Sequence, residues 1–557
     1  MDSVKPEHHH HNGEKPLASH SSYERVPGRP DFKPYSDEEL IAVADSRGFT
    51  DHTGLVVEPE EAERVFGHEI ASNLKKNKHG NVILYPQPFD DPNDPQNWSS
   101  GKKALMLAIV SAAAFIPDFV SSCGIASLFP LAAQYETTTD EINNLTSNWS
   151  IFMLGWGGLI SIFLIKKLGR LPILFWSQLF GLGWTIGQAV APNLGSFAAF
   201  RILAATFQTA PQVSGLFTVT DMYPFHLQAR MLNLWTLAFV CSPFIGPSFL
   251  GFIIGAGITW RWVYGVACIY IGIVLFFIIF FMEETQYDRH IYPVPHRPTG
   301  GLRYRIETLI GTTGWKMRKY RPSWFICVAE TFMILFKPAI LLPLVYILVV
   351  FGFGIGINVT NAVFVGSPPP FGYGLTPNQQ AGSYFSPIVG CLLGEFIGRY
   401  LNDYIASRGT HRNHGVFEPE MRLWTLYFAL PFYVAGFILL GFCFEEKLNF
   451  AGTAIGWVIA ELAILMTTVC IYAYLNNVEP YLQGEVSALV NLFRVLGGFA
   501  VPFFQIPWAE SSGPKVVFGA EAGIVAGLFL LIVPLLQWKG AAMRRAFPPR
   551  RPAVGRL

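Results

Sequence analysis

The sequence between residues 104 and 538 consists mostly of apolar segments, each long enough for a helix to cross a lipid bilayer. The hydrocarbon core of a bilayer is about 30 Å thick and takes about 20 helical residues to cross. Such segments form helices in lipid, because a helix pairs its backbone hydrogen-bonding groups internally. The sequence therefore predicts an all-α membrane protein with twelve transmembrane helices. They cover residues 104–132, 145–165, 171–192, 195–222, 231–255, 261–283, 338–363, 380–403, 423–445, 451–475, 486–508 and 516–538.

The composition argues against several other classes of protein. Of the 557 residues, 51% are hydrophobic and 14% are charged, whereas about 25% of the residues of a soluble protein are charged. The net charge of +1 gives no basic surplus for nucleic acid. The sequence contains no GxxxxGKS/T, HExxH or GxSxG motif, and its seven cysteines form no CxxC pair. We therefore expect no enzyme, no catalytic residues, no cofactor and no metal site.

The basic residues are distributed unevenly between the predicted loops. Lys and Arg favour the cytoplasmic side of a membrane. With both termini inside, 23 basic residues lie on the inner side, in the loops, in the C-terminal tail and, as Arg399, at the inner end of a span. Three, Arg261, Lys447 and Lys515, lie in or next to the outer loops. We therefore expect both termini to be cytoplasmic.

The predicted helices fall into two sets of six, in residues 104–283 and 338–538. This halving indicates two pseudo-symmetric six-helix bundles, with the substrate bound between them near the middle of the membrane.

The three remaining segments are polar. Residues 1–103 carry 18 acidic and 12 basic residues and are predicted to be a cytoplasmic, largely disordered tail, with one short helix after the capping box at 36–39. Residues 284–337 are predicted to be a cytoplasmic linker, in which the apolar segment 323–336 is too short to cross and forms an interfacial helix. Residues 539–557 form a basic cytoplasmic tail.

Two charged residues inside predicted helices are candidates for the coupling site, because ionisable groups in a membrane are costly and usually functional. Asp118 lies 14 residues from the inner end of the first helix, about 21 Å up, and Arg201 lies about 9 Å below the outer end of the fourth. The two heights agree to within a turn. A carboxylate paired with arginine stays ionised until a proton or a cationic substrate competes for it. The alternative is a purely structural ion pair.

Gln208 and Gln212 follow Arg201 at spacings that place all three on one helical face, and Pro211 allows a kink. This polar stripe either faces a wet cavity or makes hydrogen bonds between helices.

The second half has its own intramembrane polar residues. Glu461 is the corresponding acid, which either binds a cationic substrate or pairs with a neighbour such as Arg494. Asn358 and Asn361 offer neutral polar contacts.

Several runs resemble a known family. They are DPNDPQNW at 91–98, Arg201 in its helix, DMYPFHLQAR at 221–230, GPSFLG at 246–251, MEETQYDRH at 282–290 and GVFEPEMRLW at 415–424. Together they resemble fungal major facilitator superfamily transporters of the twelve-spanner drug:proton antiporter branch, which includes polyamine and organic-cation carriers. The resemblance covers about residues 85–540 and does not specify a substrate.

The resemblance implies roles for individual residues. Arg201 matches the arginine that in related exporters faces an acid of the first helix, the place that Asp118 occupies. Gly246, Pro247 and Gly251 match the antiporter motif of the fifth helix, and Ser242 stands where that motif has its first glycine.

The loop IKKLGRLP at 165–172 matches the family's inner-loop signature in Gly169 and Arg170, and departs from it at Lys166, where the family has Asp. The resemblance implies that Arg170 pairs with Asp221. We hypothesise that Glu485, at the start of the eleventh helix, compensates by pairing with Lys166. The predicted switch residues are Lys166, Gly169, Arg170, Asp221, Arg230, Gly246, Pro247, Gly251 and Glu485.

The expected function is proton-coupled export of organic cations, drugs or toxic metabolites by a monomer in the plasma membrane. Its expected partners are a small-molecule substrate, protons and the lipid bilayer, with no nucleic acid. The first alternative is proton-coupled import of polyamines or other nutrients. An alternative of another class is a membrane sensor that binds its ligand without transporting it.

Overall fold

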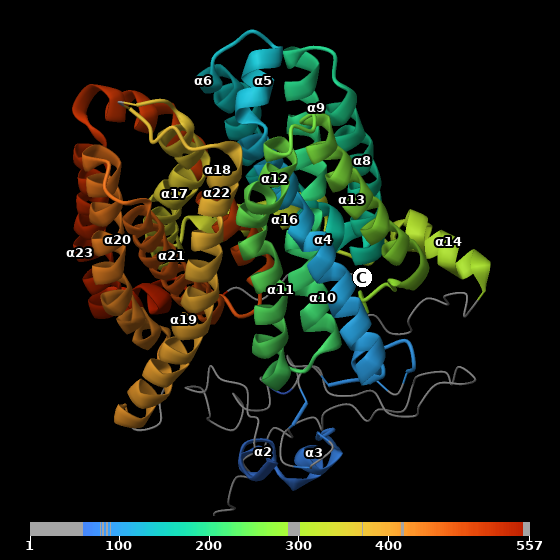
Figure 1. Cartoon of the computed structure of the whole chain (residues 1–557). Helices are drawn as coiled ribbons and strands as arrows, with labels where there is room; N and C mark the ends of the chain where they lie inside the picture. The colour runs from blue at the N-terminus through green and yellow to red at the C-terminus, as the bar shows by residue number, and fades with distance from the viewer. Residues whose placement is uncertain are drawn as a thin grey trace, which may run out of the picture. The chain divides into compact units, whose positions relative to one another are not determined.

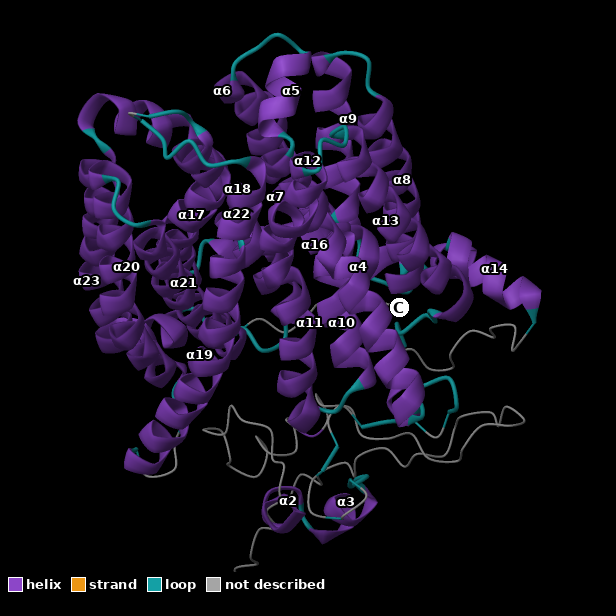
Figure 2. Ribbon diagram, viewed as in Figure 1, coloured by secondary structure: helices purple, strands orange, loops and turns teal. Residues whose placement is uncertain are grey.

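The structure is a computed structural model, shown in Figure 1, and it describes residues 40, 59–77, 80, 83–84, 87–89, 91–287, 301–369, 371–413 and 417–549. Regular structure in these residues is helical (Figure 2), apart from an isolated bridge between Lys76 and Ile83. The chain forms two compact units, Met1–Asn97 and Trp98–Leu557.

The first unit contains the helices α2 (Pro59–Phe66) and α3 (His68–Asn73). Helix α2 begins at the polar run PEEAE, which we assigned to a largely disordered tail. Its proline and its two first-turn glutamates suit a helix N-terminus, and its apolar face is buried. The predicted capping box at 36–39 lies outside the described residues.

The first half of the second unit supplies six membrane-spanning segments. In chain order its helices are α4 (Ser100–Ala126), α5 (Leu128–Gln134), α6 (Thr139–Ile142), η2 (Asn143–Asn148), α7 (Trp149–Leu168), α8 (Arg170–Val190), α9 (Leu194–Gln208), α10 (Ala210–Met222), α11 (Phe225–Ile245), η3 (Gly246–Leu250), α12 (Gly251–Gly255) and α13 (Arg261–Phe281). The fourth segment is divided between α9 and α10. Pro211 has no N–H to donate there, and the Gln212 N–H bonds the Thr209 carbonyl in a tighter turn, at 3.0 Å.

The second half supplies the other six segments and forms the yellow-to-red bundle in Figure 1. Its helices are α17 (Pro338–Gly366), α18 (Pro377–Ser383), α19 (Phe385–Arg412), η4 (Pro419–Trp424), α20 (Thr425–Glu446), α21 (Phe450–Val478), α22 (Gln483–Ser512) and α23 (Pro514–Ala546). Helix α7 packs along α22, and α12 packs on α18, so the two bundles touch through more than one helix pair. The prediction of twelve helices in two six-helix bundles is confirmed.

Nine membrane-spanning candidates among the described residues are both long and apolar enough by composition alone. The predicted segments that fall short are those of α8, α9 with α10, and α19. Helix α19 carries Glu395, Arg399 and Asp403, and the fourth segment is split into two short helices. These three segments are recognised by their place in the bundles rather than by their hydropathy.

Three helices follow the first half: α14 (Leu302–Ile310), α15 (Thr312–Met317) and α16 (Trp324–Leu335). Helix α16 forms within the segment that we predicted to be interfacial. Its buried face includes Cys327 and Glu330, while Phe325 is 81% exposed. A helix with one docked face and one exposed aromatic face suits a membrane boundary, and its interfacial position stays a prediction.

The last helix runs further than predicted. Helix α23 continues to Ala546, eight residues past the expected end of the span. Arg544 makes two parallel hydrogen bonds to Glu420, each of 2.8 Å. This arginine of the predicted basic tail therefore forms an ion pair with a residue of η4.

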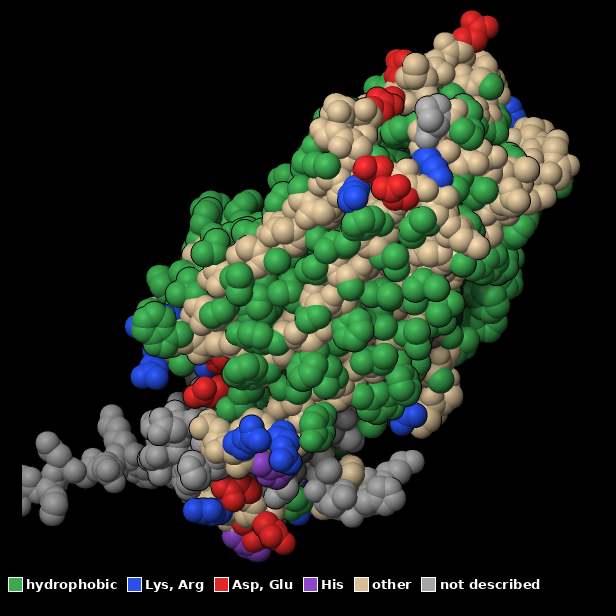
Figure 3. All heavy atoms as spheres, turned by 60° about the vertical axis from the view of Figure 1, so that its left-hand side comes forward, with side chains coloured by type: hydrophobic (Ala, Val, Ile, Leu, Met, Phe, Trp, Pro, Cys, Tyr) green, Lys and Arg blue, Asp and Glu red, His purple; other side chains and the backbone are tan. Residues whose placement is uncertain are grey.

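The surface matches a lipid environment. Figure 3 shows a broad area of hydrophobic side chains free of charged ones. Exposed Phe396, Phe428 and Leu530 belong to helices of the second half. A soluble protein rarely exposes so large an apolar area.

Candidate functional site

A small cavity lies between the two halves of the second unit. Its volume is about 60 Å³, well below the roughly 300–1,000 Å³ of a pocket that encloses a drug-sized ligand. The first half contributes Asp118, Ser121, Ser122, Ile125, Ser147, Ile151, Leu154, Val240, Pro243 and Phe244 to its walls. The second half contributes Phe351, Gly354, Ile355, Asn358, Val359, Glu461, Ile464, Arg494 and Val495.

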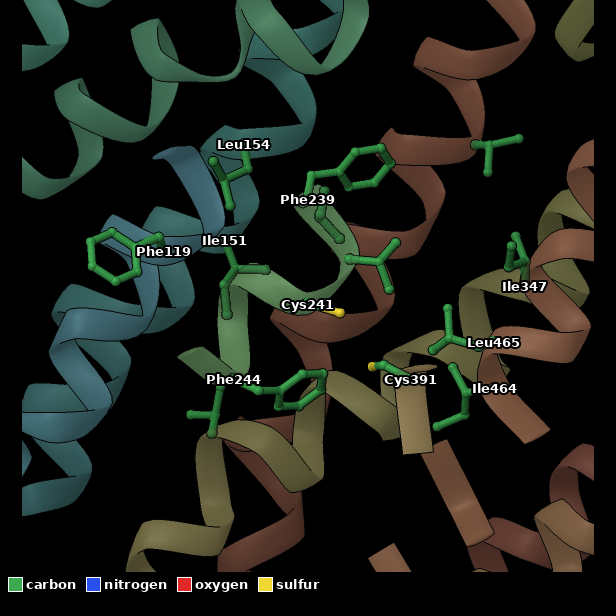
Figure 4. Close-up of a cluster of buried hydrophobic side chains, with 14 of the residues drawn as sticks. Phe119, Ile151, Leu154, Phe239, Cys241, Phe244, Ile347, Cys391, Ile464 and Leu465 are labelled. Carbon is green, nitrogen blue, oxygen red and sulfur yellow. The ribbon is translucent and has the colours of Figure 1, made fainter. Parts of the chain in front are cut away.

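Apolar side chains from both halves meet around this cavity. Ile151, Leu154 and Phe244 of the first half and Ile464 of the second, all labelled in Figure 4, line the cavity. The cavity is therefore mostly apolar, with a few polar groups that are able to orient a guest.

Asp118 borders the cavity from α4 and is half-buried. Its Oδ2 accepts a hydrogen bond of 2.7 Å from Nε2 of Gln212 on α10. Gln212 therefore orients the carboxylate, which remains the first half's acid at the cavity.

The prediction that Asp118 pairs with Arg201 is wrong. Arg201 is 1% exposed and donates to the carbonyls of Ser121 (2.6 Å) and Thr146 (3.3 Å) and to the hydroxyl of Tyr264 (2.9 Å). The guanidinium thus joins α4, η2 and α13 inside the first half and does not line the cavity.

A close approach between helices explains where Arg201 goes. A Cβ atom at Gly124 would lie 2.7 Å from its Nη2, so only glycine leaves room for the guanidinium against α4. Ser121 is three residues above Asp118, about 4.5 Å along the helix. The predicted height was therefore right to within a turn, but the bonded partner is the backbone.

Two other predicted cavity residues lie elsewhere. Gln208 is fully buried and donates to Oγ1 of Thr185 on α8 at 2.9 Å, so it makes the helix-to-helix bond that we considered as the alternative. Asn361 donates to Oγ of Ser383 at 3.2 Å and is not among the cavity residues. Asn358 does line the cavity, and its Oδ1 has no hydrogen-bond partner in the part of the chain that the structure describes.

Glu461 borders the cavity from α21 and is 4% exposed. Its Oε1 accepts from the thiol of Cys391 at 3.7 Å. That thiol faces Cys241 of α11, so this corner of the site spans the two halves (Figure 4). The cavity therefore has one carboxylate from each half.

Arg494 of α22, which the sequence offered as a neighbour of Glu461, is itself a cavity residue. It is 6% exposed, and its guanidinium lies over the ring of Phe351 at 3.9 Å from the centroid.

Sequence reasoning also missed two buried acids. Both oxygens of Glu395 on α19 have no hydrogen-bond partner among the described residues. Glu521 on α23 is fully buried and accepts from Nε2 of Gln505 at 2.9 and 3.2 Å. An acidic residue inside a predicted span was the available signal in both cases.

Three of the predicted switch residues, Gly169, Arg170 and Asp221, meet at the turn between α7 and α8. Nε of Arg170 lies 3.0 Å from Oδ2 of Asp221, which is the pair that the family resemblance implied. Gly169 has φ of 117°, a backbone conformation that favours glycine. The carboxylate of Glu284 accepts from the N–H groups of Arg170 (3.1 Å) and Leu171 (3.2 Å) and so caps the N-terminus of α8.

Lys166 and Glu485 join the two halves at the same end of the bundles. Nζ of Lys166 contacts Oε1 of Glu485 and lies 3.9 Å from Oε2 of Glu330 on α16. Next to it, Nζ of Lys167 donates to the carbonyl of Pro322 at 2.9 Å. The structure therefore brings Lys166 and Glu485 together and adds the linker helix to the contact.

The predicted glycines of the fifth segment allow close contacts at the far end. A Cβ at Gly246 would lie 2.0 Å from Oγ of Ser122 on α4, and a Cβ at Gly251 would lie 2.8 Å from Cβ of Ala381 on α18. Pro247 follows Gly246 in η3 and is buried. The second of these contacts joins the two halves.

Two further residues differ from what the family pattern suggested. Ser242, which replaces a family glycine, is fully buried, and its hydroxyl donates to the Phe239 carbonyl at 2.7 Å. Arg230 is exposed and forms no ion pair within the described part of the chain, so nothing there connects it to the other switch residues.

Comparison with known sequences agrees with this architecture. The sequence model of the Major Facilitator Superfamily matches residues 106–502. The MFS-type transporter mpsC of Macrophomina phaseolina is 26% identical over 500 residues, which cover 88% of this chain and 94% of the relative. The efflux pump radE of Floropilus chiversii is 22% identical over 471 residues, which cover 83% and 85%.

Solved structures share the fold. The xylose transporter XylE from E. coli, in a partially occluded inward open conformation, has a TM-score of 0.54 at 13% identity over 78% of this chain and 98% of that one. A bacterial homologue of the human lysosomal transporter Spinster has a TM-score of 0.50 at 16% identity, over 82% of this chain and 100% of that one. Since the family model matches most of this chain, the protein belongs to the Major Facilitator Superfamily and is a membrane transporter.

Proposed function

We propose that this transporter exports organic cations, drugs or toxic metabolites in exchange for protons. The observation that carries the proposal is the pair of carboxylates, Asp118 and Glu461, that border one cavity from opposite halves. A carboxylate in such a site binds either a proton or a cationic group, and this competition couples the two fluxes. The efflux pump among the relatives supports the outward direction.

The transport cycle that we propose alternates between two open forms. Contacts between the halves exist at the Lys166–Glu485 end and at the Gly251–Ala381 end, and the cavity between them is small. Breaking one set of contacts at a time gives the cavity access to one side at a time. The proposal places the protein in the plasma membrane as a monomer with both termini in the cytoplasm.

The test uses the purified full-length protein in proteoliposomes with an imposed pH gradient and tetraphenylphosphonium as the cationic probe. We expect outward-directed exchange in the wild type and loss of its pH dependence in Asp118→Asn and Glu461→Gln. Glu446→Gln, which changes an exposed acid at the end of α20, serves as the control. Unchanged pH dependence in both cavity variants would show that the two carboxylates take no part in coupling. Uptake of the probe driven by the proton gradient would show that the protein imports, and does not export, its substrate.

A further inference from the structure

The cavity contains a cation whose donors are not satisfied. Arg494 is 6% exposed and lines the cavity from α22. Its Nε and Nη1 have no hydrogen-bond partner among the residues that the structure describes. Leaving the donors of a buried charge unpaired costs free energy, so a complementary acceptor is expected in the working protein.

The guanidinium of Arg494 lies close to two aromatic rings. It lies over the ring of Phe351 at 3.9 Å from the centroid, and the ring of Phe239, from the other half, is 5.9 Å away. A guanidinium packs on aromatic rings through its flat faces. Its N–H groups point outward in its plane and so remain available to an acceptor. This geometry suits a carboxylate or another planar oxyanion.

The cavity acids do not fill this role. Asp118 accepts from Gln212, and Glu461 accepts from Cys391. The charge of Arg494 acts on both carboxylates, so they are near it, yet neither forms an ion pair with it within the described residues.

Charges of both signs therefore face one space with apolar walls. A purely cationic guest would meet the two carboxylates but also the repulsion of Arg494. A purely anionic guest would meet Arg494 but be repelled by the carboxylates. A guest with a cationic and an anionic group satisfies all three side chains, while Ile151, Phe244 and Ile355 contact its apolar frame.

We propose that Arg494 binds an acidic group of the substrate, so that the transported molecule is an amphiphilic zwitterion with an ammonium group, a carboxylate or similar oxyanion, and an apolar body. This assignment rests on the proposed function, in which the ammonium group competes with protons at Asp118 and Glu461. It narrows the substrate class from organic cations in general to those that also carry an acid.

The experiment compares matched compounds on one frame: phenylalanine and naphthylalanine, their amines without the carboxylate, and their acids without the amine. Binding to the detergent-purified full-length protein is measured by thermal shift, and flux by counterflow in proteoliposomes. We expect the zwitterions to bind at least about tenfold more tightly than either partner compound, as one charged hydrogen-bonded contact allows.

Three variants identify the residue. Arg494→Gln should lower the affinity for the zwitterions to that for the amines and leave amine binding equal or stronger. Arg494→Lys keeps the charge but lacks the planar guanidinium, so its affinity for the zwitterions should lie between those of the wild type and Arg494→Gln. This variant keeps the test valid if the glutamine variant does not fold. Arg318→Gln removes a guanidinium that also stacks on a ring, that of Trp315 at 3.8 Å, but outside the cavity, and should change nothing.

The outcomes separate this assignment from the proposed function. Proton-driven export of the amines with no advantage for the zwitterions overturns the role of Arg494 and leaves the proposed function standing. The opposite outcome has two parts. If Arg494→Gln abolishes the preference for zwitterions, the role of Arg494 is supported. If at the same time the flux of every compound is independent of the pH gradient, proton coupling is overturned.

Discussion

Lys166 in the last turn of α7 contacts Glu485 in the first turn of α22, so a cation at the end of a helix in one half meets an acid at the start of a helix in the other. In the family that the sequence resembles, Asp stands at the position of Lys166. Here Glu485 lies at the N-terminal end of α22, where a negative charge is favourable. The lysine therefore meets a carboxylate that the helix itself stabilises.

Reversing this pair should test its role. Lys166→Glu places two carboxylates together and Glu485→Lys places two amines together. Each single variant should lose transport and about 3–5 kcal/mol of stability, because it leaves buried like charges without an opposite partner. The double variant should recover part of the transport, measured as flux in proteoliposomes.

Glu330 sharpens this prediction, because it lies 3.9 Å from the Lys166 ammonium and would repel a glutamate there. Adding Glu330→Gln to the double variant should raise flux further, while Glu330→Gln alone should have a smaller effect. If the double variant is as inactive as the single ones, with or without Glu330→Gln, the two residues do not act as a pair.

Gly124→Ala should disturb the anchoring of Arg201. The added Cβ would lie 2.7 Å from Nη2 and 3.0 Å from Cζ of the guanidinium. We expect a loss of about 1–3 kcal/mol, seen as a lower melting temperature, because the well-packed site has little room. Gly183→Ala is the matched control, since nothing lies within 4 Å of its added Cβ, and equal melting temperatures for both variants would contradict the packing argument.

Gly251→Ala should weaken the contact between α12 and α18. The new Cβ would lie 2.8 Å from Cβ of Ala381, so the two halves would have to move apart at this end. We expect greater labelling of cysteines introduced beside this contact by a membrane-impermeant maleimide. Adding Ala381→Gly to the Gly251→Ala variant should reduce the labelling again. If the labelling does not change on adding Ala381→Gly, residues 251 and 381 are not in direct contact.

Cys241 and Cys391 should be open to cross-linking across the halves. The two thiols contact each other, one from α11 and one from α19 (Figure 4). A short thiol-specific bifunctional reagent should join the two thiols and stop transport. If the reagent has a linker that a reductant cleaves, adding the reductant should restore transport. The control is a variant in which Cys443, a residue of the second half, is the one cysteine left. It should keep its flux after treatment with the reagent. A loss of flux in this control would mean that the reagent acts at a site other than Cys241 and Cys391.

Much of the fold was predictable because its determinants are local. Segment length and apolar content predicted twelve spans, although only nine of them among the described residues are long and apolar enough by composition alone. The pairing of Arg170 with Asp221 followed from the family resemblance. The start of α2 was missed because the run PEEAE is polar, although its burial depends on Ala62, Val65 and Phe66. The end of α23 was missed because Arg544 gains a partner, Glu420, from a distant part of the chain.

The site was less predictable because sequence gives height along a helix but not direction around it. Asp118 and Arg201 lie at similar depths, yet Gly124 opens a route for Arg201 to the Ser121 carbonyl while Asp118 faces the cavity. Gln208 turns to Thr185, whereas Gln212, after the break at Thr209, reaches Asp118.

The closures at the two ends of the cavity differ in kind. Lys166, Glu485 and Glu330 form one of charges, whereas Gly251 and Ala381 meet through small uncharged groups. The charged closure is buried, since the Lys166 side chain is 19% exposed and the Glu485 side chain 2% exposed, so dissolved ions screen it weakly. Opening at the lysine end therefore has to return buried charges to water, whereas opening at the glycine end separates only small uncharged groups.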